Sequence, residues 1–112
     1  MYSPHTYGPN VYNQNYFNDA SFPANMPRIW DKHFGFIRIF KNSALVTGEW
    51  GGSTSGKNGI WFNAFINYLK SNDITDNFIW CLNPNSGDTG GLLLNDWMTP
   101  DTNKLSLVAK LV

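Results

Sequence analysis

The sequence predicts an α/β fold, built on a parallel sheet, from two apolar runs and three amphipathic segments that alternate along the chain. The runs at residues 43–49 and 77–83 are nearly continuous rather than alternating, which is typical of parallel strands buried on both faces. Segments 25–37, 58–72 and 101–112 repeat apolar residues with the period of a helix. Strands and helices in this order favour a parallel sheet that the helices cover.

The first strand is expected at the N-terminus, where "MYS" reads as the end of such a strand. In the helix predicted after it, Pro27 suits a first turn. Three positions of this helix share one apolar face, namely Ile29, then His33 or Phe34, then Ile37. We expect His33 to have a structural role there.

The other two helices also show one apolar stripe each. The stripe of the middle helix consists of Ile60 and Trp61, Ala64 and Phe65, and Tyr68 and Leu69. Either Asp101 or Thr102 is expected to cap the last helix. Its apolar residues are Leu105, Val108, Leu111 and Val112.

The loops that follow the predicted strands differ from those that lead back to them. Residues 5–27 and 83–100 form long segments rich in Gly, Asn, Asp and aromatic residues, whereas the returning connections are short. This asymmetry predicts a site at the carboxyl ends of the strands. Both a barrel and a doubly wound sheet have their sites there.

Composition limits the class of protein. The 112 residues suffice for one small domain, so we treat residues 1–112 as a single unit. The net charge is zero and no basic run occurs, which argues against nucleic-acid binding. No stretch approaches the roughly 20 apolar residues of a membrane span. No residues cluster at metal-ligand spacing, so neither a metal nor a cofactor is expected.

The N-terminus shows no basic region followed by an apolar run, so it does not read as a signal peptide. Informative residues lie close behind Met1, which suggests a fragment. The single cysteine, Cys81, excludes an internal disulfide and is expected to be a small apolar residue of a strand.

The stretch Gly48–Gly59, "GEWGGSTSGKNG", contains a near match to the phosphate-binding loop G-x-x-x-x-G-K-[ST]. A working loop needs a hydroxyl after the lysine to hold magnesium, and this chain has Asn58 there. Such a site also needs an apolar strand that ends in an aspartate for the magnesium, and neither strand offers one. We therefore expect a Gly/Ser loop that leads into a helix.

Glu49 is the only glutamate of the chain and lies at the predicted end of a buried strand. Burying a carboxylate costs free energy unless hydrogen bonds compensate, so Glu49 is either a functional carboxylate or part of a cap or ion pair. His5 and Tyr7, two residues apart after the first strand, either form an ordinary turn or point into one site. A tyrosine hydroxyl there could orient the carboxylate and keep it ionised. Trp80 is either a core residue or a stacking platform for a sugar.

Together these residues resemble glycoside hydrolase family 5, and in particular its bacterial endo-β-1,4-glucanases. The similar stretches are "YSPHTYGPNVYNQNYFNDASFPANMPRIWDKHFG", "VTGEWGG" and "WCLNPNSGDTGGLLLNDW". The resemblance implies a (β/α)₈ barrel, of which this chain would be the last three strand–helix units, strands six to eight. It also implies a β-1,4-glucan substrate and secretion from the cell.

The resemblance assigns a role to each candidate residue. Glu49 matches the catalytic nucleophile, and Tyr7 would hydrogen-bond to it. His5 would help to bind the sugar at the cleaved linkage, and Trp80 matches an aromatic platform. At the position after the nucleophile, where the family often has Phe, this chain has Trp50.

The family's acid/base glutamate, in an Asn-Glu-Pro motif, is absent from this chain. Retaining hydrolysis uses two carboxyl groups about 5–5.5 Å apart, so we expect the chain alone to be inactive. Three parallel strands also leave open edges and a bare face, which favours self-association or pairing with a complementary barrel fragment. The alternative function is a non-catalytic sugar-binding piece.

Overall fold

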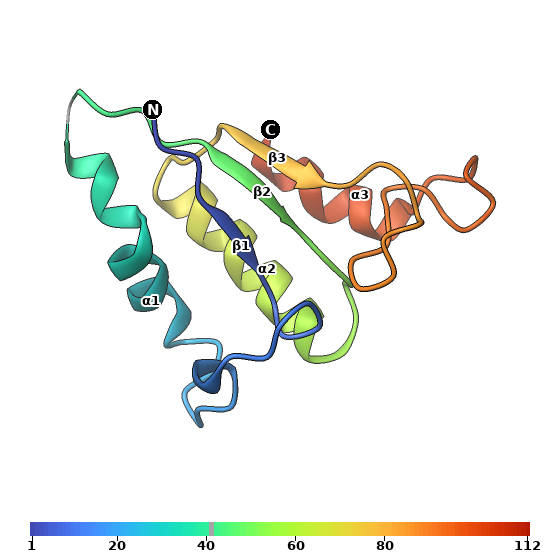
Figure 1. The fold of residues 1–112 in the computed structure, drawn as a ribbon, viewed down its shortest axis with the longest axis horizontal. Coiled ribbons are helices and arrows are strands. Elements are labelled where there is room, and N and C mark those ends of the chain that lie inside the picture. The colour runs from blue at the N-terminus through green and yellow to red at the C-terminus, as the bar shows by residue number, and fades with distance from the viewer. Residues whose placement is uncertain (41) are drawn as a thin grey trace.

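The structure is a computed structural model that describes residues 1–40 and 42–112. It contains one sheet of three parallel strands. They are β1 (His5–Tyr7), β2 (Thr47–Gly51) and β3 (Asn77–Trp80), and they lie side by side in that order. Both strand pairs are parallel, as Figure 1 shows. The predicted parallel α/β sheet is therefore confirmed.

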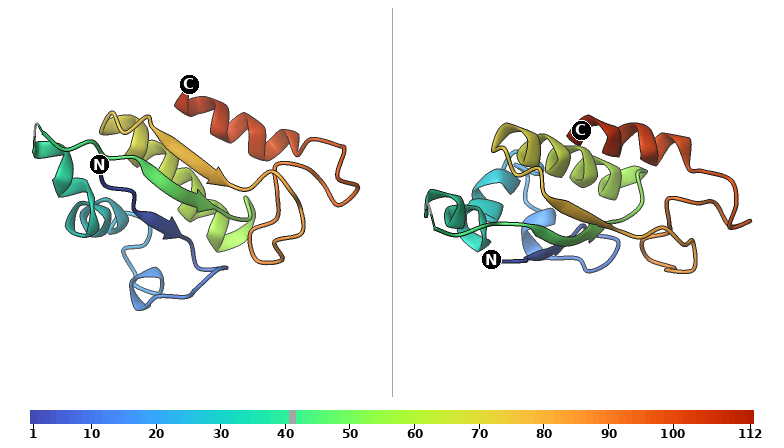
Figure 2. Two further views of the ribbon diagram at one scale, coloured as in Figure 1. Left: turned by 45° about the horizontal axis from the view of Figure 1, so that its top comes forward. Right: turned by 90° about the horizontal axis from the view of Figure 1, so that it is seen from above.

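Helices connect the strands and lie on one side of the sheet (Figure 2). The α-helices are α1 (Met26–His33), α2 (Gly56–Ser71) and α3 (Thr102–Val108). Short 3₁₀ helices are η1 (Asn15–Phe17), η2 (Gly35–Ile39) and η3 (Ala109–Leu111). The three predicted helical segments are confirmed, although the first and the last each end in a 3₁₀ turn. Asp101 caps α3, since its carboxylate accepts a hydrogen bond from the Lys104 amide at 2.9 Å.

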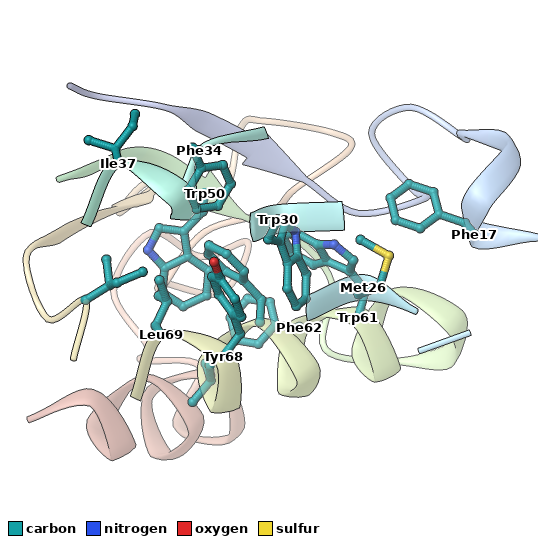
Figure 3. Close-up of a cluster of buried hydrophobic side chains, with 13 residues drawn as sticks. Phe17, Met26, Trp30, Phe34, Ile37, Trp50, Trp61, Phe62, Tyr68 and Leu69 are labelled. Atoms are coloured by element: carbon teal, nitrogen blue, oxygen red, sulfur yellow. The ribbon is translucent and has the colours of Figure 1, made fainter. Parts of the chain in front are cut away.

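The core lies between the sheet and its helices and consists largely of aromatic rings (Figure 3). The Trp50 side chain extends from β2 and packs against Phe62 and Phe65 of α2. Trp30 of α1 contacts Trp61 of α2 with ring centroids 6.4 Å apart. Each fully buried ring of this size contributes about 1.5–3 kcal/mol of hydrophobic free energy. This aromatic layer therefore supplies much of the hydrophobic free energy that holds the sheet and the helices together.

The strands differ from the prediction at their ends. His5 and Tyr7 belong to β1 itself rather than to a loop after it, and Glu49 lies in the middle of β2 rather than at its end. Hydrophobicity alone did not mark these ends because polar residues continue the ladder. The pairing also extends backwards through a bridge between Tyr2 and Leu45.

The expectation that the strands are buried on both faces is wrong for β3. Its side chains alternate, with Ile79 packed against the core and Phe78 exposed to 67%. Trp80 is exposed to 45%, on the same side as Phe78. The helices cover only the opposite side of the sheet (Figure 2), so the apolar run keeps one bare face.

Some helical positions also differ from their predicted stripes. Ile60, a residue of the predicted stripe, is 48% exposed. Phe62 and Ile66 lie outside that stripe and are buried, because the sheet and the other helices contact α2 on more than one side. Of the two candidates at the end of α1, Phe34, which directly follows the helix, is buried, whereas His33 is exposed. In the last helix Leu105 and Val112 are exposed, and Leu107 joins Val108 and Leu111 against the core.

Candidate active site

Adjacent strands bring Glu49, His5 and Tyr7 together. His5 pairs with Glu49 in the register of β1 and β2, and Tyr7 follows two residues later on the same face. The buried neighbour Trp50 points into the helical layer, so Glu49 points to the bare face of the sheet. The Tyr7 hydroxyl donates a hydrogen bond to Glu49 Oε1, and His5 Nδ1 lies 3.6 Å from Oε2. Both Glu49 oxygens thus face a partner from β1.

The hydrogen bond gives the Tyr7 hydroxyl a fixed role as a donor. Burial raises its pKa well above the usual range, and the hydrogen bond to Glu49 raises it further, as do the charges of Glu49, Cys81 and Asp88. Tyr7 therefore keeps its proton at neutral pH. The Glu49 side chain is 29% exposed and that of His5 57%, so the carboxylate is accessible from the bare face.

Glycine at position 48 allows β1 to lie this close. A Cβ on Gly48 would clash with the Ser3 hydroxyl and would come within 3.4 Å of His5 Cδ2. The absence of a side chain at Gly48 is therefore needed for the close packing of Ser3 and His5 against β2.

Trp80 lies on the same face, one strand further along the sheet. The register pairs Tyr7 with Gly51 and Gly51 with Trp80, so the three positions form one row across the strands. The peptide bond between Trp80 and Cys81 is cis. The interpretation of Trp80 as a core residue is wrong, since Trp80 is 45% exposed and takes no part in the core. Its role as a platform for a sugar stays a prediction.

The loop after β3 adds residues to which the sequence assigned no role. The Trp80 indole nitrogen donates to Ser86 Oγ at 3.3 Å, and Ser86 Oγ donates to Asp88 Oδ1 at 3.1 Å. The only sequence signal for this pair is the clustering of small polar residues in "NPNSGDTGG".

The near match to a phosphate loop has a structural use instead. Asn58 is fully buried, and its side chain donates to the Ser53 carbonyl at 2.7 Å and accepts from the Asn10 amide at 3.2 Å. Lys57 turns to Asn18, to which its ammonium donates at 2.7 Å. The lysine and the residue after it are thus both engaged within the protein.

Within residues 1–40 and 42–112, no group of three or more His, Cys, Asp or Glu side chains is arranged to hold a metal ion. None of the helices in that part of the chain is long and apolar enough to cross a membrane.

Comparison with models of known protein families identifies the family of this chain. Residues 1–86 match the family model described as cellulase (glycosyl hydrolase family 5). The chain belongs to this family.

Individual family 5 relatives agree with that assignment. The chain is 44% identical to the major extracellular endoglucanase of Xanthomonas campestris pv. campestris, with 99% of the chain aligned. It is also 44% identical to an endoglucanase of Paenibacillus polymyxa over its whole length. It covers only 23% and 29% of these two proteins.

Solved structures of endocellulases share the fold. A Pyrococcus horikoshii endocellulase, a variant in complex with cellotetraose, superposes with a TM-score of 0.93 at 43% identity. The alignment covers 98% of this chain and 30% of that one. The catalytic domain of the Xanthomonas campestris endoglucanase superposes with a TM-score of 0.89. The prediction of a TIM-barrel segment, with the barrel incomplete in this chain, is thus confirmed.

Family membership does not by itself assign roles to residues. The structure brings Glu49, His5 and Tyr7 together and leaves Trp80 exposed on the same face. Their functions, and the numbering of the strands as six to eight, stay predictions.

Proposed function

We propose that this chain carries the nucleophile half of the active site of a retaining endo-β-1,4-glucanase. The observation that supports this most is the Glu49 carboxylate, which accepts a hydrogen bond from Tyr7, lies beside His5 and is accessible from the bare face. Glu49 attacks the anomeric carbon of a bound glucosyl unit, and the glycosidic C–O bond breaks to give a covalent glycosyl ester. Water then hydrolyses this ester and releases the sugar.

The Tyr7 hydroxyl holds the carboxylate in one rotamer and leaves Oε2 on the side of His5. Because its own pKa is raised, Tyr7 remains a donor and does not place a second negative charge beside Glu49. The His5 ring, which is more than half exposed, is available to a sugar hydroxyl. Trp80 offers its ring to the apolar face of a glucosyl unit on the same side of the sheet.

The reaction also needs a proton for the departing oxygen, and the only glutamate of this chain is already the nucleophile. General acid–base assistance is typically worth about 10²–10⁴ in rate. We therefore propose that the chain alone hydrolyses natural β-1,4 linkages at a negligible rate. A leaving group that departs without a proton, such as dinitrophenolate, removes that requirement from the first step.

A mechanism-based label tests the nucleophile directly. Incubation with 2,4-dinitrophenyl 2-deoxy-2-fluoro-β-cellobioside should add one fluorocellobiosyl group to the chain, and peptide mapping should place it on Glu49. Glu49→Gln should abolish the adduct, because an amide does not attack the anomeric carbon. Asp76→Asn is the matched control, since Asp76 is an exposed acid at the other end of β3, and it should be labelled like the parent.

An adduct on another residue, or one that survives in Glu49→Gln, would contradict the proposal. Turnover of cello-oligosaccharides by the purified chain that disappears in Glu49→Gln would contradict the claim that it is inactive alone.

A second candidate is a non-catalytic sugar-binding piece, which the exposed Trp80 ring favours. Cellotetraose binding without any covalent labelling would support it. A third role, completion of a barrel with a chain that supplies the remaining strands, is favoured by the bare face of the sheet. Mixing the chain with such a fragment should then restore hydrolysis. By similarity to the relative named an extracellular endoglucanase, we propose that the chain acts outside the cell.

A further inference from the structure

The loop between β3 and α3 contains a short series of hydrogen bonds that begins at Trp80. An indole N–H can only donate, so Ser86 Oγ accepts from Trp80 at 3.3 Å. The Ser86 hydroxyl in turn donates a hydrogen bond to Asp88 Oδ1 at 3.1 Å. A carboxylate at the end of the series polarises the hydroxyl and makes it a better acceptor for the indole.

The loop that carries Ser86 and Asp88 is itself fixed. Lys104 of α3 is 5% exposed, and its ammonium donates to the carbonyls of Thr89 at 3.1 Å and Gly91 at 3.0 Å. The residues on either side of Ser86 and Asp88 are also joined, since the Leu92 amide donates to the Cys81 carbonyl at 2.8 Å. Ser86 therefore extends from a braced segment rather than from a free one.

Trp80 needs such support because core packing does not hold its ring. Its side chain is 45% exposed and lies outside the buried aromatic cluster. An exposed ring exchanges between rotamers, and a ligand that stacks on it must first order it. If the ring is already fixed before binding, the affinity for a ligand that stacks on it rises about threefold to tenfold.

We propose that Ser86 and Asp88 are positioning residues that fix the indole ring of Trp80, with Lys104 bracing the loop that carries them. The effect on sugar binding rests on the proposed role of Trp80 as a platform, whereas the effect on the ring does not.

The mobility of each indole N–H in the full 112-residue chain tests the proposal. The ¹⁵N relaxation of the five indole groups is measured, and Trp80→Phe identifies the Trp80 signal. In the parent, the order parameter of Trp80 should be in the rigid range near 0.85. In Ser86→Ala and in Asp88→Ala it should fall toward 0.6 or below, while the buried Trp50 and Trp61 stay unchanged.

Conservative variants separate positioning from a general loss of structure. Ser86→Thr keeps a hydroxyl and Asp88→Asn keeps an oxygen acceptor, so both should retain most of the Trp80 order. Ser106→Ala is the matched control, because that hydroxyl donates to the backbone carbonyl of Asn103 at 2.7 Å. An unchanged Trp80 order parameter in both alanine variants would overturn the proposal. So would a fall that Trp50 shares, since the effect would then be global.

Cellotetraose titration of the same variants separates this inference from the proposed function. If Trp80 is a platform, Ser86→Ala should weaken binding about threefold to tenfold and Ser86→Thr should restore it. If Trp80→Phe and Ser86→Ala leave cellotetraose affinity unchanged while Ser86→Ala frees the ring, the positioning is supported and the platform role fails.

Discussion

At the scale of single residues, Asn58 illustrates how a motif can mislead and still mark an important position. Its buried side chain links the loop after β1, through Asn10, to the loop after β2, through Ser53. A Cβ on Gly8 would clash with the same amide and with Trp61, so the loops are fitted closely around it. The residue that breaks the phosphate-loop pattern thus joins two of the loops at the candidate site.

Replacing Asn58 by Ala should lower the free energy of unfolding by about 1–3 kcal/mol, because two hydrogen bonds are lost and the Ser53 carbonyl loses its donor. Asn67→Ala, at an exposed position of the same helix, should change it by less than about 0.5 kcal/mol. Urea unfolding followed by circular dichroism measures both. Equal effects of the two substitutions would show that the link is unimportant.

Tyrosine ionisation should make stability fall at alkaline pH. Burial and the hydrogen bond to Asp31 raise the pKa of Tyr68 above 10, the value for the unfolded chain, so the unfolded state loses this proton first. The contribution of Tyr68 is complete below about pH 10 and decreases as the pH rises above it. The urea midpoint between pH 9 and 11 should therefore fall less steeply in Tyr68→Phe.

The difference between parent and Tyr68→Phe isolates this contribution. Burial lowers the pKa of Lys104, which acts in the opposite direction, but Lys104 is present in both proteins. Parallel pH dependences would contradict the assignment to Tyr68.

At the scale of elements, α3 is unusual because its most buried side chain is a lysine. Lys104 is 5% exposed, while Leu105 next to it is 38% exposed. Its ammonium replaces water for two carbonyls of the loop before the helix. The helix therefore fixes the long loop after β3 in addition to covering the core.

Lys104→Met should lower the free energy of unfolding by about 1–3 kcal/mol, since two carbonyl oxygens lose a charged donor while the apolar volume is retained. Lys110→Met removes a charge from an exposed position near the end of the chain and should have little effect. Urea titration compares the two variants, and a stability of Lys104→Met equal to that of Lys110→Met would argue against the brace.

The sequence predicted the elements better than it predicted their surroundings. The period of apolar residues identified the three helices, because α2 in particular must bury rings such as Trp61 and Phe65. It did not predict that Lys104 is buried or that Ile60 is exposed, since both depend on which side of a helix meets another element. The residues alone left a turn open for His5 and Tyr7, whereas the family resemblance implied a hydrogen bond from Tyr7 to Glu49, and the structure has that bond. The Ser86–Asp88 pair was missed because a loop of small polar residues has no period to interpret.

At the scale of the whole molecule, the sheet has helices on one side and a bare face on the other. On the bare face, Phe78 and Trp80 of β3 are exposed to 67% and 45%. Apolar side chains gathered in this way are typical of a surface that another chain covers. The chain spans less than a third of its relatives. Additional strands of a barrel would pair with the open edges of β1 and β3, and the bare face would then line the barrel interior.

Phe78→Lys should reduce self-association of the isolated chain, because a charge on the bare face opposes its burial against a second copy. Ile60→Lys is the control, since Ile60 is a similarly apolar and exposed residue on the helical side. Sedimentation velocity over a range of concentrations measures both. A larger effect of Ile60→Lys would place the contact on the helices instead.

Because β1 is short and lies at the edge of the sheet, we expect it to detach before the core unfolds. Three residues, His5–Tyr7, form this edge strand, and they include both partners of Glu49. Edge segments open at lower free energy than a buried core, while the rings around Trp50 and Phe65 stay in place. On gradual unfolding the Glu49 carboxylate would therefore lose its orientation before the fold is lost. The candidate site would thus be disrupted under milder conditions than the core.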